Sequence, residues 1–304
     1  MTVEIPSNET VIPLFVKCLE ALQNLCTLEI VSMDDIMTTP LKPNPVIFIH
    51  GMWIHATAWQ PWLELFESRG YSASAPGWPG DAPTVEETRE HPEAMNDIGI
   101  AEIVSHYAEI IGTPAVKPIL VGHSFGGLVA EELLANGYAA AAVALDPAGI
   151  KGVKALPFAQ LKSAFPVLGN PANRHRGVSL TASQFRYAFG NMLTEEESDA
   201  LHAAWAIPGP GRALFQEAGA TFSPHSPAKV DTHNAERGPL LLTSGTDDHT
   251  VPMKVTKEVF AMYSKGPADT ELHLFEGRGH SLSMDSGWKD VAEVALAWFE
   301  TKGF

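Results

Sequence analysis

The sequence has 304 residues, of which 45% are hydrophobic and 18% charged, and its formal net charge is −16. This composition is typical of a folded chain with a sizeable core, so it excludes a chain that is disordered over its whole length. Negative charge scattered along the chain disfavours nucleic acid and anionic membrane surfaces as partners, so we expect a small-molecule substrate.

Residues 1–37 are predicted to form an N-terminal amphipathic extension. Lys17 and Glu20 interrupt its apolar stretch, which argues against a membrane span or a signal peptide and favours a cytoplasmic protein. Three interpretations stay open: packing on the main domain, a homodimer contact, or an appendage before a domain that begins at Met37. Apolar residues recur at helical spacing, namely Leu14, Phe15, Cys18, Leu22, Leu25 and Cys26.

Strand and helix patterns alternate from Pro45 to Gly149. The apolar run Pro45–Gly51 ends in a turn glycine and is typical of a strand buried on both faces of a parallel sheet. The pattern then predicts a helix over 59–68, a strand over 71–75, a helix over 97–111, a strand in PILVGHS, a helix over 128–136 and a strand in AAAVALD.

Regular alternation stops over residues 150–238. Helical pieces such as TASQFRYAFG and LTEEESDALHAAW occur there, the second with Thr194 as its N-cap. Alternation returns with the strand PLLLTSG, a helix over 253–263, the strand ELHLFEG and a helix over 288–299. We therefore predict an α/β core over 38–149 and 239–304 that carries a helical cap over 150–238.

The stretch GHSFG matches the pattern G-x-S-x-G and lies between an apolar strand and a helix. Glycines beside Ser124 leave room for a sharp turn that exposes the hydroxyl, so Ser124 is the predicted nucleophile. A serine nucleophile needs a general base to take its proton. His280 follows the strand ELHLF, which is where the base stands when the triad residues occur in the chain order Ser, acid, His. We interpret His50, His123 and His249 as loop structure.

The acid that orients the base is predicted in LLLTSGTDDHTVP, at the end of a strand. Asp248 is preferred because three residues, Gly245 to Asp247, are available to round the strand end. Spacing does not separate it from Asp247, and Asp146 at the end of the strand AAAVALD is a second alternative.

Backbone N–H groups of Met52 and Phe125 are the predicted oxyanion donors. Met52 follows the turn glycine of FIHGMW, and Phe125 begins the helix after Ser124. Aromatic residues predict a mostly apolar pocket of moderate size, with Trp53, Phe185, Phe189 and Trp205 as substrate contacts. No metal site is predicted, because Asp231, His233 and His225 lack ligand spacing.

HGMW, GHSFGG, GTDDHTVP and GRGHS, in this order, resemble the α/β-hydrolase fold superfamily. The resemblance spans Pro45 to the C-terminus. It implies a mostly parallel eight-stranded sheet with a helical cap after the sixth strand, and no cofactor. It also assigns Ser124, Asp248 and His280 as a triad, with Met52 and Phe125 as oxyanion donors.

Hydrolysis of a carboxylic ester or lactone through an acyl-enzyme is the predicted activity. The same triad also serves carbon–carbon bond hydrolysis, cyanohydrin cleavage and perhydrolysis, which no motif here excludes. A ligand-binding scaffold without catalysis is the third class, and the presence of every triad residue argues against it.

Overall fold

Six parallel strands form the central sheet of the computed structural model, which describes residues 41–304. The extension predicted over residues 1–37 lies outside these residues. Across the sheet the strands follow the order β2 (Ala73–Ser74), β1 (Val46–Ile49), β3 (Ile119–His123), β4 (Ala141–Leu145), β7 (Leu240–Gly245) and β8 (Thr270–Phe275).

The number of strands in the sheet differs from the eight that the resemblance implied. Within residues 41–304 it has six, and the long insertion follows β4, the fourth of them along the chain. One edge is β2, which pairs with β1 through only two residues, Ala73 and Ser74. No further strand of the described chain pairs beyond β2, so this side of the sheet ends there.

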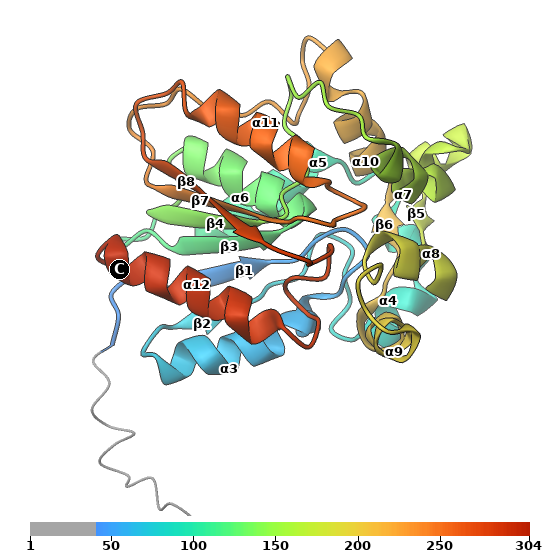
Figure 1. Ribbon diagram of the computed structural model, residues 1–304, viewed down its shortest axis with the longest axis horizontal. Coiled ribbons are helices and arrows are strands. Elements are labelled where there is room, and N and C mark those ends of the chain that lie inside the picture. Colours follow the sequence, from blue (N-terminus) through green and yellow to red (C-terminus); the bar gives the residue numbers. More distant parts are fainter. Residues whose placement is uncertain (1–40) are drawn as a thin grey trace, which may run out of the picture. The chain divides into compact units, whose positions relative to one another are not determined.

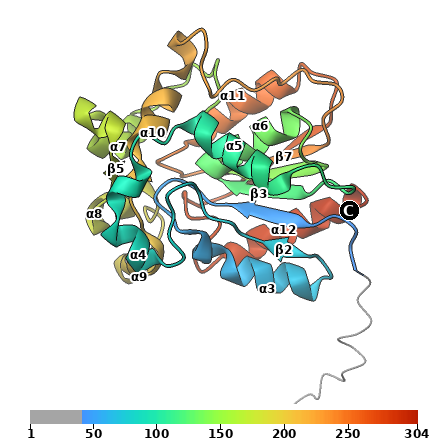
Figure 2. The ribbon, with the colours of Figure 1, turned by 180° about the vertical axis from the view of Figure 1, so that it is seen from behind.

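Alternate residues of each strand enter two separate cores. In β1, Ile47 and Ile49 pack on one side, whereas Val46 and Phe48 pack on the other, as the pleat of a strand requires. Figures 1 and 2 show the helices on each side of the sheet. One face is covered by α5 (Ile100–Ile111), α6 (Phe125–Ala135) and α11 (Met253–Tyr263), and the other by α3 (Gln60–Ser68) and α12 (Trp288–Thr301).

The segment between β4 and β7 holds four α-helices at the end of the sheet where its strands terminate (Figure 1). These are α7 (Phe158–Leu168), α8 (Ala182–Ala188), α9 (Glu195–Trp205) and α10 (Gly211–Ala218). A two-stranded antiparallel pair, β5 (Gly177–Val178) and β6 (Gly209–Pro210), accompanies them. Short helices complete the described chain: η1 (Ala56–Trp59), α4 (Val85–Glu90), η2 (Pro92–Met95), η3 (Pro171–His175) and η4 (Ala220–Phe222).

Backbone hydrogen bonds join this segment to the loop after β1. The Ile207 N–H donates to the Trp53 carbonyl at 2.9 Å, and the His55 N–H donates to the Trp205 carbonyl at 3.0 Å. Thr194 caps α9 by accepting from the Glu197 N–H, as the sequence predicts. None of the helices in residues 41–304 is long and apolar enough to cross a membrane.

Glu131 is an acidic residue inside the core, on α6, and only 1% of it is exposed. Burial raises the pKa of its carboxyl to about 8, although the Tyr263 hydroxyl and the Arg237 guanidinium favour the ionised form. Because the folded protein holds this proton more tightly than the unfolded chain does, Glu131 lowers stability as pH rises from about 4.5 to about 8.

Replacing Glu131 with Gln should therefore stabilise the protein increasingly across that pH range, because the amide has no proton to lose. The gain relative to wild type should grow by up to about 1.4 kcal/mol per pH unit and level off above the folded pKa. Chemical denaturation at a series of pH values measures it. The exposed Glu109 on α5 supplies the control, Glu109→Gln; an equal gain there would contradict the assignment to burial.

Candidate active site

Ser124 occupies a strained turn between β3 and α6. Its backbone φ of 56° lies in the left-handed region that residues with a side chain seldom adopt. The Ser124 N–H donates to the Leu145 carbonyl at 2.8 Å, and the Ser124 carbonyl accepts from the N–H groups of Gly127, Leu128 and Ala148. These bonds hold the turn, so the serine side chain projects from a rigid backbone.

Glycines make this turn sterically possible. A Cβ on Gly122 would overlap the Gly126 carbonyl, and a Cβ on Gly126 would overlap the Ile49 carbonyl of the neighbouring strand. A Cβ on Gly51 would come within 2.9 Å of the Ser124 Cβ. The two glycines of GHSFG are therefore required for close backbone approach, and Gly51 in the facing loop has the same role.

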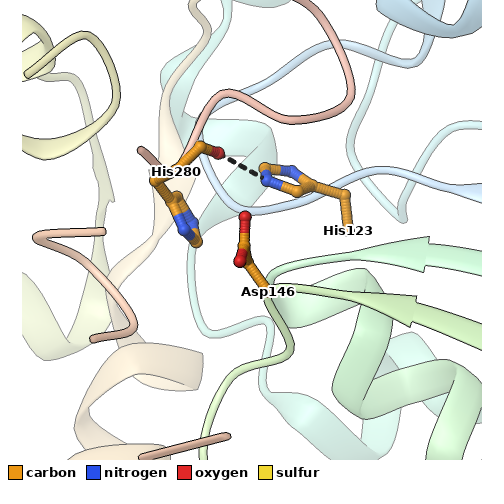
Figure 3. Close-up of side chains that lie close together, drawn as sticks. All are labelled: His123, Asp146 and His280. Carbon is orange, nitrogen blue, oxygen red and sulfur yellow. Dashed lines mark hydrogen bonds between the residues drawn. The ribbon is translucent and has the colours of Figure 1, made fainter. Parts of the chain in front are cut away.

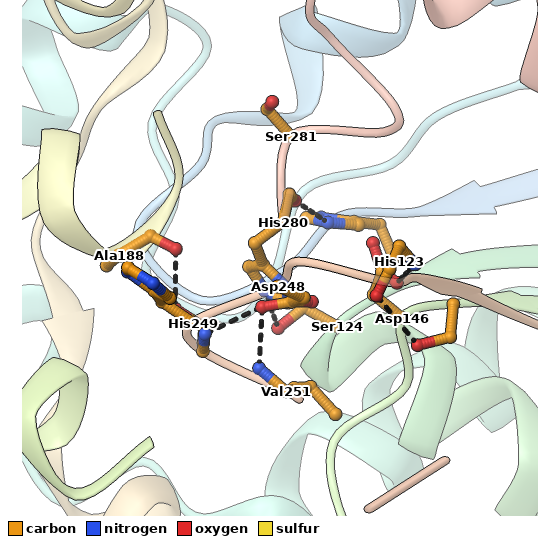
Figure 4. Close-up of polar contacts among 12 residues, drawn as sticks. His123, Ser124, Asp146, Ala188, Asp248, His249, Val251, His280 and Ser281 are labelled. Carbon is orange, nitrogen blue, oxygen red and sulfur yellow. Dashed lines mark hydrogen bonds and ion pairs between the residues drawn. The ribbon is translucent and has the colours of Figure 1, made fainter. Parts of the chain in front are cut away.

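A buried hydrogen-bonded chain links Ser124, His280 and Asp248 (Figure 4). The Ser124 hydroxyl lies 2.9 Å from His280 Nε2, and His280 Nδ1 lies 2.6 Å from Asp248 Oδ2. The other oxygen of Asp248 accepts from the backbone N–H groups of Thr250 and Val251 at 2.6 and 2.8 Å. These two bonds and the imidazole stabilise the ionised carboxylate, which orients His280 towards Ser124.

The two alternative acids lie elsewhere. Asp247 is exposed, and its carboxylate accepts from the Thr246 hydroxyl. Asp146 is fully buried, and its Oδ1 accepts from the Gly245 N–H at 2.7 Å. Burial, and next the charge of Asp248, raise the pKa of Asp146 well above its usual value, which favours the neutral form of this carboxyl.

His123, Asp146 and His280 lie close together, with their candidate ligand atoms within 4.8 Å of one another (Figure 3). His123 Nε2 donates to the His280 backbone carbonyl at 2.8 Å, and both ring nitrogens of His280 contact Asp248 and Ser124. Burial lowers the pKa of His123 well below its usual value, and the neighbouring His280 adds to this effect. Three of the four ring nitrogens of the two histidines thus have protein partners, whereas His123 Nδ1 and Asp146 Oδ2 have none among the described residues.

Two further histidines also contact loops. His50 Nδ1 lies 3.0 Å from the Gly51 carbonyl, and its Nε2 lies 2.9 Å from Asp81 Oδ2. His249 Nδ1 lies 3.1 Å from the Tyr187 carbonyl. These contacts match the interpretation of His50 and His249 as loop structure, and the pairing of His50 with Asp81 carries no signal in the sequence.

The backbone N–H groups of Met52 and Phe125 flank the serine. Met52 follows Gly51, which packs against Ser124, and Phe125 is the first residue of α6. Within residues 41–304 neither N–H donates to a protein acceptor. Both are thus available to an oxygen that develops negative charge beside Ser124.

A cavity of about 420 Å³, including its mouth, opens beside Ser124 and Phe125. Of the four aromatic residues predicted to contact substrate, the structure brings only Trp53 to this cavity. Phe185 and Phe189 are almost fully buried and stack on each other at 4.8 Å, and Trp205 packs partly buried against the core. Large aromatic groups on amphipathic helices gain much from burial, and the Phe189 ring packs 4.9 Å from the His280 ring.

Other residues of the cavity were missed by the sequence analysis. They come from α7, α10 and the loop before α11, and include Gln160, Ser163, Leu214, Glu217, Thr250 and Val251. No motif marks them, because the face that an isolated helix turns to a cavity depends on how the helix packs.

Comparisons with known proteins agree with this fold. A family model described as the alpha/beta hydrolase family matches residues 46–294. The non-heme chloroperoxidase CPO-A1 of Kitasatospora aureofaciens is 27% identical over 277 residues, which cover 85% of this chain and 93% of that protein. The chain therefore belongs to the alpha/beta hydrolase family.

Solved structures share the fold at lower identity. The pyrethroid hydrolase PytH is similar with a TM-score of 0.59 and 17% identity, over 86% of this chain and 99% of that one. Polyneuridine aldehyde esterase is similar with a TM-score of 0.59 and 18% identity, over 84% and 99% of the two chains.

Replacing Gly126 with Ala should destabilise the protein by about 3 kcal/mol or more, because the new methyl group must displace the β1 backbone. The free energy of unfolding from urea denaturation measures the loss. Gly219→Ala is the matched control, since φ there is −89° and the nearest atom to the new Cβ would lie at 3.3 Å. Equal, small losses in the two variants would show that the approach at Gly126 is not constrained.

Proposed function

We propose that this alpha/beta hydrolase cleaves a carboxylic ester or lactone of a small to medium, mostly apolar substrate through an acyl-enzyme. The observation that carries the proposal is the hydrogen-bonded chain from Ser124 through His280 to Asp248, at the floor of a cavity. Two free N–H groups beside the serine, on Met52 and Phe125, add support.

In the proposed reaction, the Ser124 oxygen attacks the substrate carbonyl while His280 Nε2 takes the hydroxyl proton. Asp248 stabilises the imidazolium that forms, and the Met52 and Phe125 N–H groups donate to the oxyanion. His280 then gives the proton to the leaving alkoxide. Water, deprotonated by His280, attacks the acyl-enzyme, and Ser124 recovers its proton as the carboxylic acid leaves.

We also propose that residues 150–238 act as a cap that shapes the substrate site. Residues of α7 and α10 line the cavity beside Ser124, and backbone bonds at Trp53 and His55 hold this segment against the loop after β1. The lining is mainly apolar, which supports a substrate with a hydrocarbon portion.

Perhydrolysis is a second candidate, supported by the relative named a non-heme chloroperoxidase. In this reaction hydrogen peroxide replaces water in the second step: its oxygen attacks the acyl-enzyme, the ester bond to Ser124 breaks, and a peracid leaves. Both candidates use the same acyl-enzyme, so they differ only in which nucleophile reaches it.

Replacing Ser124 with Ala should lower kcat/KM for short p-nitrophenyl esters by about 10⁴-fold or more, because the nucleophile is lost. Labelling with a fluorophosphonate probe should disappear in the same variant. Unchanged ester hydrolysis by the variant would refute the assignment of Ser124.

A matched pair of substitutions tests which aspartate is the acid. Asp248→Asn should lower kcat by about 10⁴-fold, because the amide no longer stabilises the charged imidazole in the required orientation. Asp146→Asn should change kcat far less, since His280 Nδ1 bonds to Asp248 and Asn keeps an acceptor for the Gly245 N–H. Steady-state kinetics on one ester decides between them: a large loss only in Asp146→Asn would reverse the assignment.

A further inference from the structure

A second cavity adjoins the one beside Ser124. It has a volume of about 540 Å³ including its mouth, and it lies between α7, α10 and the loop after β4. The two cavities share three lining residues: Gln160, Ala164 and Glu217. The two cavities therefore lie side by side, with these three residues between them.

The second cavity is lined mainly by hydrocarbon side chains. Ile150, Val153, Leu156, Leu161, Leu168 and Val255 belong to its wall. Such a wall favours an apolar segment of substrate, because burying hydrocarbon surface releases free energy.

Two polar side chains lie where the cavities meet. The Gln160 side-chain oxygen is buried and accepts no hydrogen bond from the residues that the structure describes. Glu217 lies on α10, and burial raises the pKa of its carboxyl to about 7 while the Gly149 N–H partly offsets this shift. The Gln160 oxygen is a buried acceptor without a donor, which is unfavourable, so a donor from a bound molecule would stabilise this junction.

We propose that Gln160 and Glu217 form a substrate subsite that selects a substrate carbon chain bearing a hydrogen-bond donor. The donor is a hydroxyl or an ammonium group, and it lies between or beyond apolar segments of that carbon chain. This inference rests on the proposed function, since it places the scissile carbonyl at Ser124. The carbon chain next to the carbonyl occupies the first cavity, the donor meets Gln160 and Glu217, and any further hydrocarbon enters the second cavity.

The chemistry of the junction explains why such a donor is selected. Gln160 offers an amide oxygen and Glu217 a carboxyl that can ionise when a cation approaches, so each can accept from a donor group. An unsubstituted alkyl chain would cover these oxygens without bonding to them, which costs free energy. Discrimination between the two kinds of chain therefore comes from the substrate's donor and not from its length.

The test compares three series of methyl esters of graded chain length: unsubstituted, ω-hydroxy and ω-amino, the last as its ammonium form at neutral pH. Wild-type kcat/KM, followed by pH-stat, should favour the donor-bearing ester by about tenfold at the length that reaches the junction. Glu217→Leu and Gln160→Leu should each lower this ratio several-fold. Glu217→Gln should keep most of the hydroxyl preference and lose that for ammonium.

Controls separate the subsite from folding and from the catalytic assignment. Glu196→Gln, at an exposed position on α9, should leave the ratio as in wild type. Calorimetry with Ser124→Ala measures binding of the same esters without turnover. The subsite is supported if this variant binds donor-bearing esters preferentially and the double variant Ser124→Ala/Glu217→Leu does not. This holds even if the wild type hydrolyses no ester. Absence of hydrolysis would refute the proposed function and leave the subsite standing.

Other results would overturn the subsite. Wild type that hydrolyses unsubstituted esters as well as donor-bearing ones at every length would refute it while leaving the proposed function intact. The subsite would also be refuted if the preference for donor-bearing esters survived in both Glu217→Leu and Gln160→Leu. Thermal unfolding curves verify that each variant is folded.

Discussion

The arrangement of this site depends on one steric constraint, the close approach of three backbone segments around Ser124. Gly122 packs against the Gly126 carbonyl, Gly126 packs against the end of β1, and Gly51 packs against the serine itself. Glycine is the residue that permits all three approaches. Because β1 and β3 are paired neighbours with Ile49 opposite Gly122, the serine emerges beside the loop that carries the Met52 N–H. The same contacts thus place the proposed nucleophile and the proposed oxyanion donors.

Around this turn, burial limits how many groups can carry charge. Asp146, Asp248, His123 and His280 are all nearly inaccessible to solvent. Asp248 accepts from two backbone N–H groups and from His280, which supports its negative charge. Burial raises the pKa of Asp146 and lowers that of His123, which disfavours the charged form of each. The bond from His280 Nδ1 to Asp248 sets the direction in which the His280 ring points, and the His123 bond to the His280 carbonyl holds the loop in place.

The proposed catalytic residues and the proposed substrate-selecting residues come from different segments of the chain. The strand ends and following turns of the core supply Ser124, Phe125 and Asp248, whereas α7 and α10 of the insertion supply Gln160 and Glu217. The core positions are tightly constrained by packing. The insertion is joined to the core by backbone bonds such as Ile207 to Trp53, and also by side-chain bonds such as those that Arg89 donates to carbonyls of the insertion.

The sequence alone predicted the strand–turn–helix that carries Ser124, the α/β class and most element boundaries, because these depend on local patterns. The turn glycines beside Ser124 and the apolar runs of the strands act within a few residues. Tertiary structure was needed to place Asp248, rather than the adjacent Asp247 or the distant Asp146, beside His280. It also showed that Phe185 and Phe189 are core, that the described sheet has six strands, and that Gln160 and Glu217 face the cavities. Neighbouring residues at the end of a strand point in different directions, and a helix face has no partner until the chain folds, so only packing decides these contacts.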